Sequence, residues 1–320
     1  MKIIIFGLGS IGSRHARLLK ELPHELFAFR SNPNSEQNSL GIPEIHSLSE
    51  LGRIKPELAI IANPTDKHIE YATYCAEKGI NLFIEKPLSM DMRGVDKLGK
   101  LVESKKIMTY IGYDLRFHPA IAWLKEYLTH NTPLHVSVYA SSYLPDWRKN
   151  VDYRSHYSAI SSRGGGVILE LSHEIDYLVY LLGEVISFKV YSARAGNITK
   201  DAEDFADVLL HFKSKAYASL HIDFLSRLLR REIIMDFEDC TIVADLVGHK
   251  ITIIKDQQNS AVPCKSESTL CFKIDKDDFY RMQMANVLKS IEMKKPMMNS
   301  WSESLGIFEL IIKIKKEAKL

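Results

Sequence analysis

The sequence lacks any uninterrupted apolar stretch long enough to cross a bilayer, and the apolar run in its opening MKIIIFGLG ends at Gly7. A secretory signal needs a longer apolar region followed by a small-residue cleavage site. Cysteine is scarce, with four residues that form no CxxC pair: Cys75, Cys240, Cys264 and Cys271. These absences argue against a zinc site or a disulfide framework. They predict a soluble, cytoplasmic protein with reduced thiols and no membrane partner.

The chain also lacks a large net charge, because 42 Lys and Arg residues nearly balance 40 Asp and Glu residues, leaving +2. This balance argues against nucleic acid as the main partner. The histidines are dispersed without HExxH-type spacing, so no metal site is expected. A length of 320 residues exceeds the usual size of one hydrophobic core and predicts two domains.

In the first third of the chain, apolar segments suited to buried parallel strands alternate with segments of helical periodicity. This βαβα order predicts an α/β Rossmann domain, a doubly wound parallel sheet with helices on both faces, over residues 1–118. The expected strands are Lys2–Phe6, Leu26–Phe29, Leu58–Ala62, Asn81–Ile84 and Ile107–Ile111.

After residue 118 the expected strands are longer and tend to alternate in polarity, and short turns connect several of them. We expect an α+β domain over residues 119–320 with a large open antiparallel sheet arranged as a meander. The expected helices are Ala120–Leu128, Leu171–Leu182 and others from Phe279 onward. The expected strands are Leu134–Tyr143, Ile186–Ala193, Phe205–Phe212, Ala216–Phe224, Glu232–Phe237 and Lys250–Ile254.

The segment Gly7-Leu8-Gly9-Ser10-Ile11-Gly12 has the spacing GxGxxG, directly after an apolar strand and at the start of a helix. In that context Gly7 allows a tight turn, Gly9 lets the backbone approach a pyrophosphate, and Gly12 lets helix and strand pack closely. The N–H groups at the helix start, from Ser10 and Ile11 onward, favour phosphate binding. The pattern predicts a dinucleotide site.

At the end of the second strand, where a site for NAD carries an acid, this chain reads Phe29-Arg30-Ser31-Asn32. Arg30 and Ser31 are suited to a ribose 2′-phosphate, so the sequence favours NADP over NAD. The alternative is that Arg30 is a solvated loop residue.

Several short motifs in the right order resemble those of the Gfo/Idh/MocA oxidoreductase family over essentially the whole chain. They are Asn63-Pro64-Thr65…His68, Glu85-Lys86-Pro87, Gly112-Tyr113…Arg116-Phe117-His118-Pro119, and Gly164-Gly165-Gly166 ahead of His173 and Asp176. The family oxidises or reduces hydroxyl and keto groups, mostly on sugars, cyclitols and nucleotide-linked sugars. Many of its members hold the Lys–Pro bond in the cis form and assemble as dimers or tetramers through the open sheet.

Carried over to this chain, the resemblance implies that Lys86 and His173 are the catalytic residues. It implies that His173 exchanges a proton with the substrate hydroxyl and that Lys86 donates a hydrogen bond to the reacting oxygen. It also implies cofactor contacts from Asn63, Pro64, Thr65, His68, Glu85 and Lys86.

One departure concerns the acid that many members carry four residues before the histidine. That position is Leu169 here, so Glu170 or Asp176 is expected to support His173, or the acid is missing. Either acid also fits a role in capping or in the edge of the core.

The stretch Tyr143-Leu144-Pro145-Asp146-Trp147-Arg148…Tyr153-Arg154…Tyr157 looks like a branch of the family found in bacterial surface-sugar pathways. Arg148 and Arg154 are suited to an anionic group, and Trp147 and Tyr157 to a sugar face. The alternative is a structural loop held by aromatic residues. Arg116 is expected to be either structural or substrate-lining.

Together these features predict an NAD(P)-dependent oxidoreductase that moves a hydride between nicotinamide C4 and a hydroxyl or keto carbon of a sugar, cyclitol or nucleotide sugar. We expect a homodimer or homotetramer. The alternatives are a same-fold reductase of a non-sugar substrate, such as a tetrapyrrole, and a nucleotide-binding protein that has lost catalysis.

Overall fold

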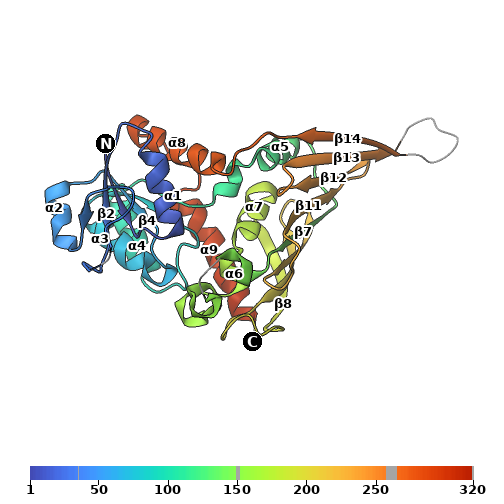
Figure 1. Cartoon of the computed structure of the whole chain (residues 1–320). Helices are drawn as coiled ribbons and strands as arrows, with labels where there is room; N and C mark the ends of the chain where they lie inside the picture. Colours follow the sequence, from blue (N-terminus) through green and yellow to red (C-terminus); the bar gives the residue numbers. More distant parts are fainter. Residues whose placement is uncertain (35, 149–151, 257–264, 319–320) are drawn as a thin grey trace. The chain divides into compact units, whose positions relative to one another are not determined.

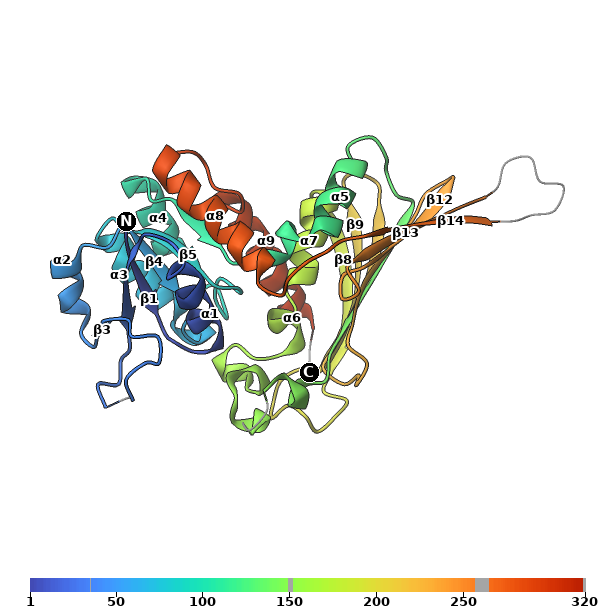
Figure 2. The same cartoon turned by 45° about the horizontal axis from the view of Figure 1, so that its top comes forward.

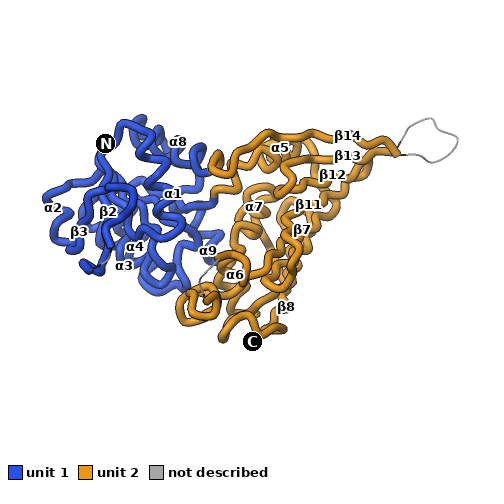
Figure 3. The backbone as a smooth tube through the Cα atoms, in the orientation of Figure 1, with its two compact units in different colours: residues 1–113, 280–309 blue, residues 114–279, 310–320 orange. Residues whose placement is uncertain are grey.

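The computed structural model describes residues 1–34, 36–148, 152–256 and 265–318. It divides the chain into two compact units, and each is considered by itself. Unit 1 comprises residues 1–113 and 280–309, and unit 2 comprises residues 114–279 and 310–320 (Figure 3). This division differs from the expected boundary at residue 118, because a C-terminal segment returns to the first unit.

Unit 1 contains a parallel six-stranded sheet in the order β3-β2-β1-β4-β5-β6, which is the Rossmann order. Strand β4 is buried at every residue, and β1 and β5 are buried at every residue after the first, as their near-continuous apolar sequences predict. Strand order reverses at β1, so the turn that follows Phe6 lies at the topological switch point. The strands are β1 (Lys2–Phe6), β2 (Glu25–Phe29), β3 (Glu44–Ile45), β4 (Leu58–Ile61), β5 (Asn81–Ile84) and β6 (Thr109–Ile111).

Helices α1 (Ser10–Leu19), α2 (Leu51–Ile54), α3 (His68–Glu77) and α4 (Val95–Lys105) connect these strands. Two C-terminal helices, α8 (Asp278–Met293) and α9 (Trp301–Glu317), contribute the rest of unit 1, and α9 ends in unit 2. The returning segment is held by specific contacts. Tyr280 packs against His15, and the Asn299 amide donates to the Ile111 carbonyl at 2.6 Å.

Unit 2 is built on an eight-stranded sheet in the order β14-β13-β12-β11-β7-β10-β9-β8. Its strands are β7 (His135–Ser141), β8 (Val185–Ala193), β9 (Phe205–Phe212), β10 (Tyr217–Asp223), β11 (Arg230–Asp236), β12 (Cys240–Asp245), β13 (Lys250–Asp256) and β14 (Lys265–Cys271). The sheet is mostly antiparallel, as expected, but it is not a simple meander.

The expectation of a meander was wrong at β7, which inserts between β10 and β11 and runs parallel to β10. The long connection between β7 and β8 allows this placement. Strands β10 and β11 follow each other in the sequence after a short connection, but they are not neighbours in the sheet. Strands β12 and β14 were not expected. Every residue of β14 is exposed, so its sequence KSESTLC carries no apolar alternation.

Helices α5 (Pro119–Tyr127), α6 (Val167–Glu170) and α7 (His173–Leu182) lie against one face of the unit 2 sheet (Figures 1 and 2). No described helix covers the opposite face, which we call the open face. Several large side chains are exposed on it, including Tyr191 at 68%, Leu209 at 59% and Tyr217 at 54%.

Among the described cysteines, Cys75, Cys240 and Cys271 are free thiols, and Cys264 lies outside the described residues. Within those same residues, no helix is both long and apolar enough to span a membrane.

Candidate functional site

The glycine turn of unit 1 follows β1 and leads into α1. Gly7 has φ +88°, a left-handed conformation that glycine adopts without steric cost. A Cβ on Gly12 would lie 1.9 Å from the Gly7 carbonyl oxygen, so only glycine allows the helix to approach the strand this closely. The turn therefore has the geometry that the GxGxxG spacing predicts.

Two features of this turn fit a nucleotide cofactor. A Cβ built on Gly9, the residue that caps α1, would meet no protein atom within 4 Å, so packing does not explain the glycine there. No side chain caps the N-terminus of α1, so Ser10 and Ile11 begin the helix with backbone donors suited to phosphate. Beside the turn, the buried Asn63 Oδ1 has no hydrogen-bond partner among the described residues.

Arg30 follows β2 and is held in place by Glu44 of β3, with Nη1 3.1 Å from Oε1. Nη1 also donates to the Glu36 carbonyl at 2.5 Å, and Asn38 donates to the same Glu44 carboxylate at 2.6 Å. Burial alone would raise the pKa of Glu44, but the hydrogen bonds from Asn38 and Arg30 outweigh it and lower the pKa. Arg30 is thus an anchored cation rather than a freely solvated one, and Ser31 beside it is exposed.

The loops after β4 and β5 are joined by His68, whose side chain is buried. Its Nδ1 lies 2.9 Å from the Pro87 carbonyl and its Nε2 lies 2.9 Å from the Asn63 carbonyl. Burial lowers the pKa of His68, although its hydrogen bonds oppose the shift. His68 therefore positions the loop Asn63-Pro64-Thr65 against the segment that carries Lys86, and its cofactor contact stays a prediction.

Glu85 and Lys86 follow β5, and the Lys86–Pro87 bond is cis, as the resemblance implied. The Glu85 carboxylate accepts a hydrogen bond at 2.6 Å from Nε2 of His15, a buried residue of α1. It also accepts the backbone N–H of Lys86 at 3.3 Å. Glu85 is thus engaged inside unit 1 and positions the backbone of Lys86.

In unit 2, His173 is the first residue of α7 and its side chain is 12% exposed. Its Nδ1 lies 3.6 Å from Oδ1 of Asp114, which begins the 3₁₀ turn η3 (Asp114–Phe117). The next residue of the helix, Glu174, is fully buried and accepts a hydrogen bond from Arg231 at 2.7 Å. Although burial alone would lower the pKa of Arg231, the negative charges of Glu174 and Asp114 contribute to raising it.

The two acids expected to support His173 are placed differently. Asp176 binds Arg116 through both oxygens, at 2.7 and 2.9 Å, and both side chains are almost fully buried. This buried pair favours the structural alternative for Arg116. Glu170 ends helix α6, whereas His173 begins α7, so the two do not share one helical face.

The aromatic loop of unit 2 brings together part of the expected substrate set. Arg148 lies 5.9 Å from the ring centroid of Tyr157 and contacts the His156 ring. Burial, followed by the positive charge of Arg148, lowers the pKa of His156 to about 4. Trp147 donates to Ser142 at 2.9 Å, and Arg154 is exposed. The described residues include no group of three or more histidine, cysteine or acidic side chains suited to a metal ion.

The sequence reasoning missed three residues that the structure places beside predicted ones: His15, Glu44 and Asp114. Glu44 and His15 come from other elements, and only long-range packing brings them to Arg30 and Glu85. Asp114 had an available signal, because it follows a parallel strand at the carboxyl edge where ligand residues gather.

Two family models match this chain. Residues 1–113 match an oxidoreductase family with an NAD-binding Rossmann fold, and residues 132–243 match the C-terminal domain of the same family. The chain belongs to the Gfo/Idh/MocA oxidoreductase family.

Within the Gfo/Idh/MocA family, a myo-inositol 2-dehydrogenase from Thermotoga maritima is 27% identical over 235 residues, covering 68% of this chain. The match spans 66% of that relative, just under two thirds of its length. Among solved structures, levoglucosan dehydrogenase in complex with NADH and levoglucosan has a TM-score of 0.87 at 17% identity, covering 99% of this chain and 97% of that one.

A second solved structure is the WlbA dehydrogenase from Bordetella pertussis in complex with NADH and UDP-GlcNAcA. Its TM-score is 0.83 at 18% identity, with 99% of this chain and 95% of that chain covered. At these identities the two structures establish the shared fold.

Proposed function

We propose that this protein is an NAD(P)-dependent dehydrogenase that oxidises a hydroxyl group, or reduces the corresponding carbonyl group, on a sugar, cyclitol or nucleotide sugar. The observation that carries the proposal is the arrangement at the carboxyl ends of β1, β4 and β5. There the open glycine turn adjoins the Asn63 loop, and His68 ties that loop to the segment bearing Lys86. Cofactor-binding geometry and a candidate catalytic lysine thus belong to one hydrogen-bonded framework.

The bound cofactor supplies the hydride acceptor or donor. In the oxidation direction, His173 accepts the proton of the substrate hydroxyl, and Lys86 donates a hydrogen bond to that oxygen as negative charge develops on it. Glu85 is engaged by His15 and the Lys86 backbone, so it positions Lys86 rather than acting as the base.

The catalytic assignment is tested by Lys86→Ala and His173→Ala after a substrate has been found. We expect each variant to lower kcat by about 10²–10⁴-fold while NADPH binding stays within a few-fold of wild type. Lys97→Ala and His130→Ala, which change exposed residues, are the matched controls. Near-normal turnover in either catalytic variant would remove that residue from the mechanism.

The substrate class follows from the relatives and from the aromatic loop. The named relatives are a myo-inositol 2-dehydrogenase, a levoglucosan dehydrogenase and a dehydrogenase in complex with UDP-GlcNAcA. Arg148, supported by Tyr157, and the exposed Arg154 suit a substrate that carries a carboxylate or phosphate. A panel of neutral cyclitols, neutral sugars and acidic nucleotide sugars tests this substrate class. Turnover of neutral substrates alone would contradict the proposal that the substrate carries a carboxylate or phosphate.

For the cofactor we propose NADP over NAD, with Arg30 and Ser31 facing the 2′-phosphate. A guanidinium has five N–H donors, and Glu44 and the Glu36 carbonyl engage Nη1. Titration of nicotinamide fluorescence with NADPH and NADH measures the preference, and tighter NADH binding would overturn it. Arg30→Ala is expected to weaken NADPH by about 10–100-fold and NADH by much less.

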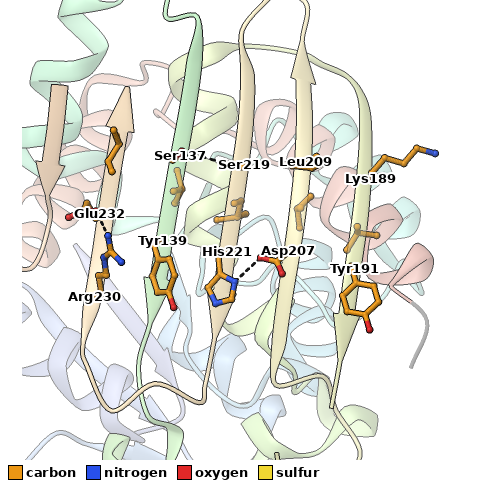
Figure 4. Close-up of a pocket in the computed structure, with 15 residues that line it drawn as sticks. Ser137, Tyr139, Lys189, Tyr191, Asp207, Leu209, Ser219, His221, Arg230 and Glu232 are labelled. Atoms are coloured by element: carbon orange, nitrogen blue, oxygen red, sulfur yellow. Dashed lines mark hydrogen bonds and ion pairs between the residues drawn. The ribbon is translucent and has the colours of Figure 1, made fainter. Parts of the chain in front are cut away.

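We further propose that the protein is a homodimer or homotetramer assembled through the open face. Side chains of β7, β8, β9, β10 and β11 line a hollow of about 530 Å³ on this face. Tyr191 and Leu209 are among these side chains (Figure 4). Exposed apolar area of this kind marks interaction surfaces. Light scattering on Leu209→Arg, with Leu22→Arg in unit 1 as control, tests it. A wild-type monomer would contradict the proposal, and cytoplasmic localisation stays a prediction of the sequence.

A further inference from the structure

The family pattern does not say which acidic residue supports His173, because Leu169 occupies the position of the usual aspartate. Asp176 is the neighbouring acid on α7, but both of its oxygens accept hydrogen bonds from Arg116. Asp176 therefore forms a buried ion pair with Arg116 inside unit 2. Glu170 lies on a separate short helix that ends before His173.

Asp114 is the acid that the fold brings to the ring of His173. The two residues are 59 positions apart in the sequence, yet Oδ1 of Asp114 lies 3.6 Å from Nδ1 of His173. Their side chains are only 10% and 12% exposed, so water screens the interaction weakly. Hydrogen bonds in catalytic sites are often long without substrate and shorten in the productive complex.

His173 is the first residue of the ten-residue helix α7. The tautomer of its ring decides which nitrogen can accept a proton. A neutral imidazole has two tautomers, with the proton on Nδ1 or on Nε2. An ionised carboxylate accepts hydrogen bonds only, so it stabilises the tautomer with the proton on the nearer nitrogen.

We propose that Asp114 is a positioning residue that holds His173 in the Nδ1–H tautomer and so leaves the lone pair of Nε2 available for proton transfer. The proposal rests on the proposed dehydrogenase function, in which His173 is the base. Asp114 thereby takes the place of the aspartate that this sequence lacks.

In the oxidation direction, the hydroxyl proton moves to Nε2 and the O–H bond electrons become the new C=O bond as the hydride leaves for the oxidised cofactor. The resulting imidazolium carries protons on both nitrogens, and the Asp114 carboxylate stabilises its positive charge. In the reverse direction Nε2 returns the proton to the oxygen. The same logic holds in serine proteases, where an asparagine in place of the orienting aspartate leaves histidine in the wrong tautomer and lowers kcat by about 10⁴-fold.

Neighbouring charges support Asp114 as the orienting group. Glu174, although adjacent to His173 in the chain, forms an ion pair with Arg231. Arg231 also interacts electrostatically with Asp114, so a positively charged guanidinium acts on that carboxylate as well.

The first test uses protein labelled with ¹⁵N at histidine, because the ¹⁵N chemical shifts and ¹H–¹⁵N couplings of the ring report the tautomer. His173→Gln identifies the His173 signals among those of the 12 histidines. We expect pyrrole-type Nδ1 and pyridine-type Nε2 in the wild type at about pH 8, where a neutral imidazole dominates. A wild-type Nε2–H tautomer would overturn the proposal, whether or not Asp114→Asn folds.

Asp114→Asn should shift His173 toward the Nε2–H tautomer, because the asparagine amide can donate to Nδ1. Asp204→Asn is the matched control: Asp204, like Asp114, is a buried acid of unit 2, and it accepts two backbone N–H groups, from Ala195 and Gly196. It should leave the His173 signals unchanged. An unchanged tautomer in Asp114→Asn, or a changed one in Glu170→Gln, would refute the assignment.

The kinetic test then uses the substrate found in the panel. Asp114→Asn is expected to lower kcat by about 10²–10⁴-fold with KM and NADPH binding within a few-fold of wild type. Failure of the wild-type enzyme to turn over would refute the proposed function, whereas an unaltered tautomer in the variant refutes only the role of Asp114.

Discussion

Replacing Asp176 by asparagine tests a buried ion pair of unit 2. The Arg116 and Asp176 side chains are 0% and 1% exposed and share two charge-assisted hydrogen bonds. Asparagine keeps the volume but removes the negative charge and presents an amide donor to a guanidinium that has only donors. Arg116 would then keep a buried charge without its counter-ion.

Breaking a buried pair in this way typically costs about 3–5 kcal/mol of unfolding free energy. Unit 2 contains 177 residues, from 166 in 114–279 and 11 in 310–320. For a domain of that size, 1 kcal/mol corresponds to roughly 2–4 °C in Tm. The expected decrease in Tm is therefore about 6–20 °C.

Circular dichroism melting of wild type, Asp176→Asn and the double variant Arg116→Met/Asp176→Leu measures this effect. The double variant removes both charges, so it should recover most of the lost stability. A single variant that melts within about 1 °C of wild type would refute the structural assignment, because an uncompensated buried charge cannot be that inexpensive energetically.

Two further predictions concern the other parts of the chain. Gly12→Ala should abolish detectable NADPH binding in a fluorescence titration, because its Cβ would meet the Gly7 carbonyl at 1.9 Å; binding within about tenfold of wild type would contradict the assigned turn geometry. On the open face, hydrogen bonds with Asp223 and Asp207 raise the pKa of His221 above 6.5, so their stabilisation is present below that value and is lost as pH rises through the folded pKa. The Tm difference between wild type and His221→Gln should thus be larger at about pH 5.5 than at about pH 9, and a pH-independent difference would disprove the linkage.

Local sequence patterns were sufficient for the Rossmann sheet. Its five main strands are short buried apolar runs, and each was expected within two residues of its observed bounds, because burial on both faces leaves a continuous apolar signal. The glycine turn was equally predictable, since Gly7 and Gly12 each meet a local steric requirement. The family resemblance supplied Lys86 and His173, which no periodicity singles out.

Features that depend on long-range pairing could not be predicted from the sequence. Strand β7 lies between β10 and β11, and the local alternation of polar and apolar residues does not determine this strand order. Strand β14 is exposed on all its residues, so nothing in its composition marks it. Asp114 was passed over because helical spacing directs attention to acids near His173 in sequence, whereas the contact is made across 59 residues.

The return of residues 280–309 to unit 1 has a consequence for biosynthesis. On the ribosome, the first 113 residues emerge long before Gln283, Asn299 and Trp301, which contact Tyr110, Ile111 and Gly99. Until then the nascent Rossmann sheet has one flank without its final covering helices. Translation therefore completes both units only near the end of the chain, because residues 280–309 belong to unit 1 and residues 310–320 to unit 2. A premature stop anywhere before residue 280 leaves both units unfinished.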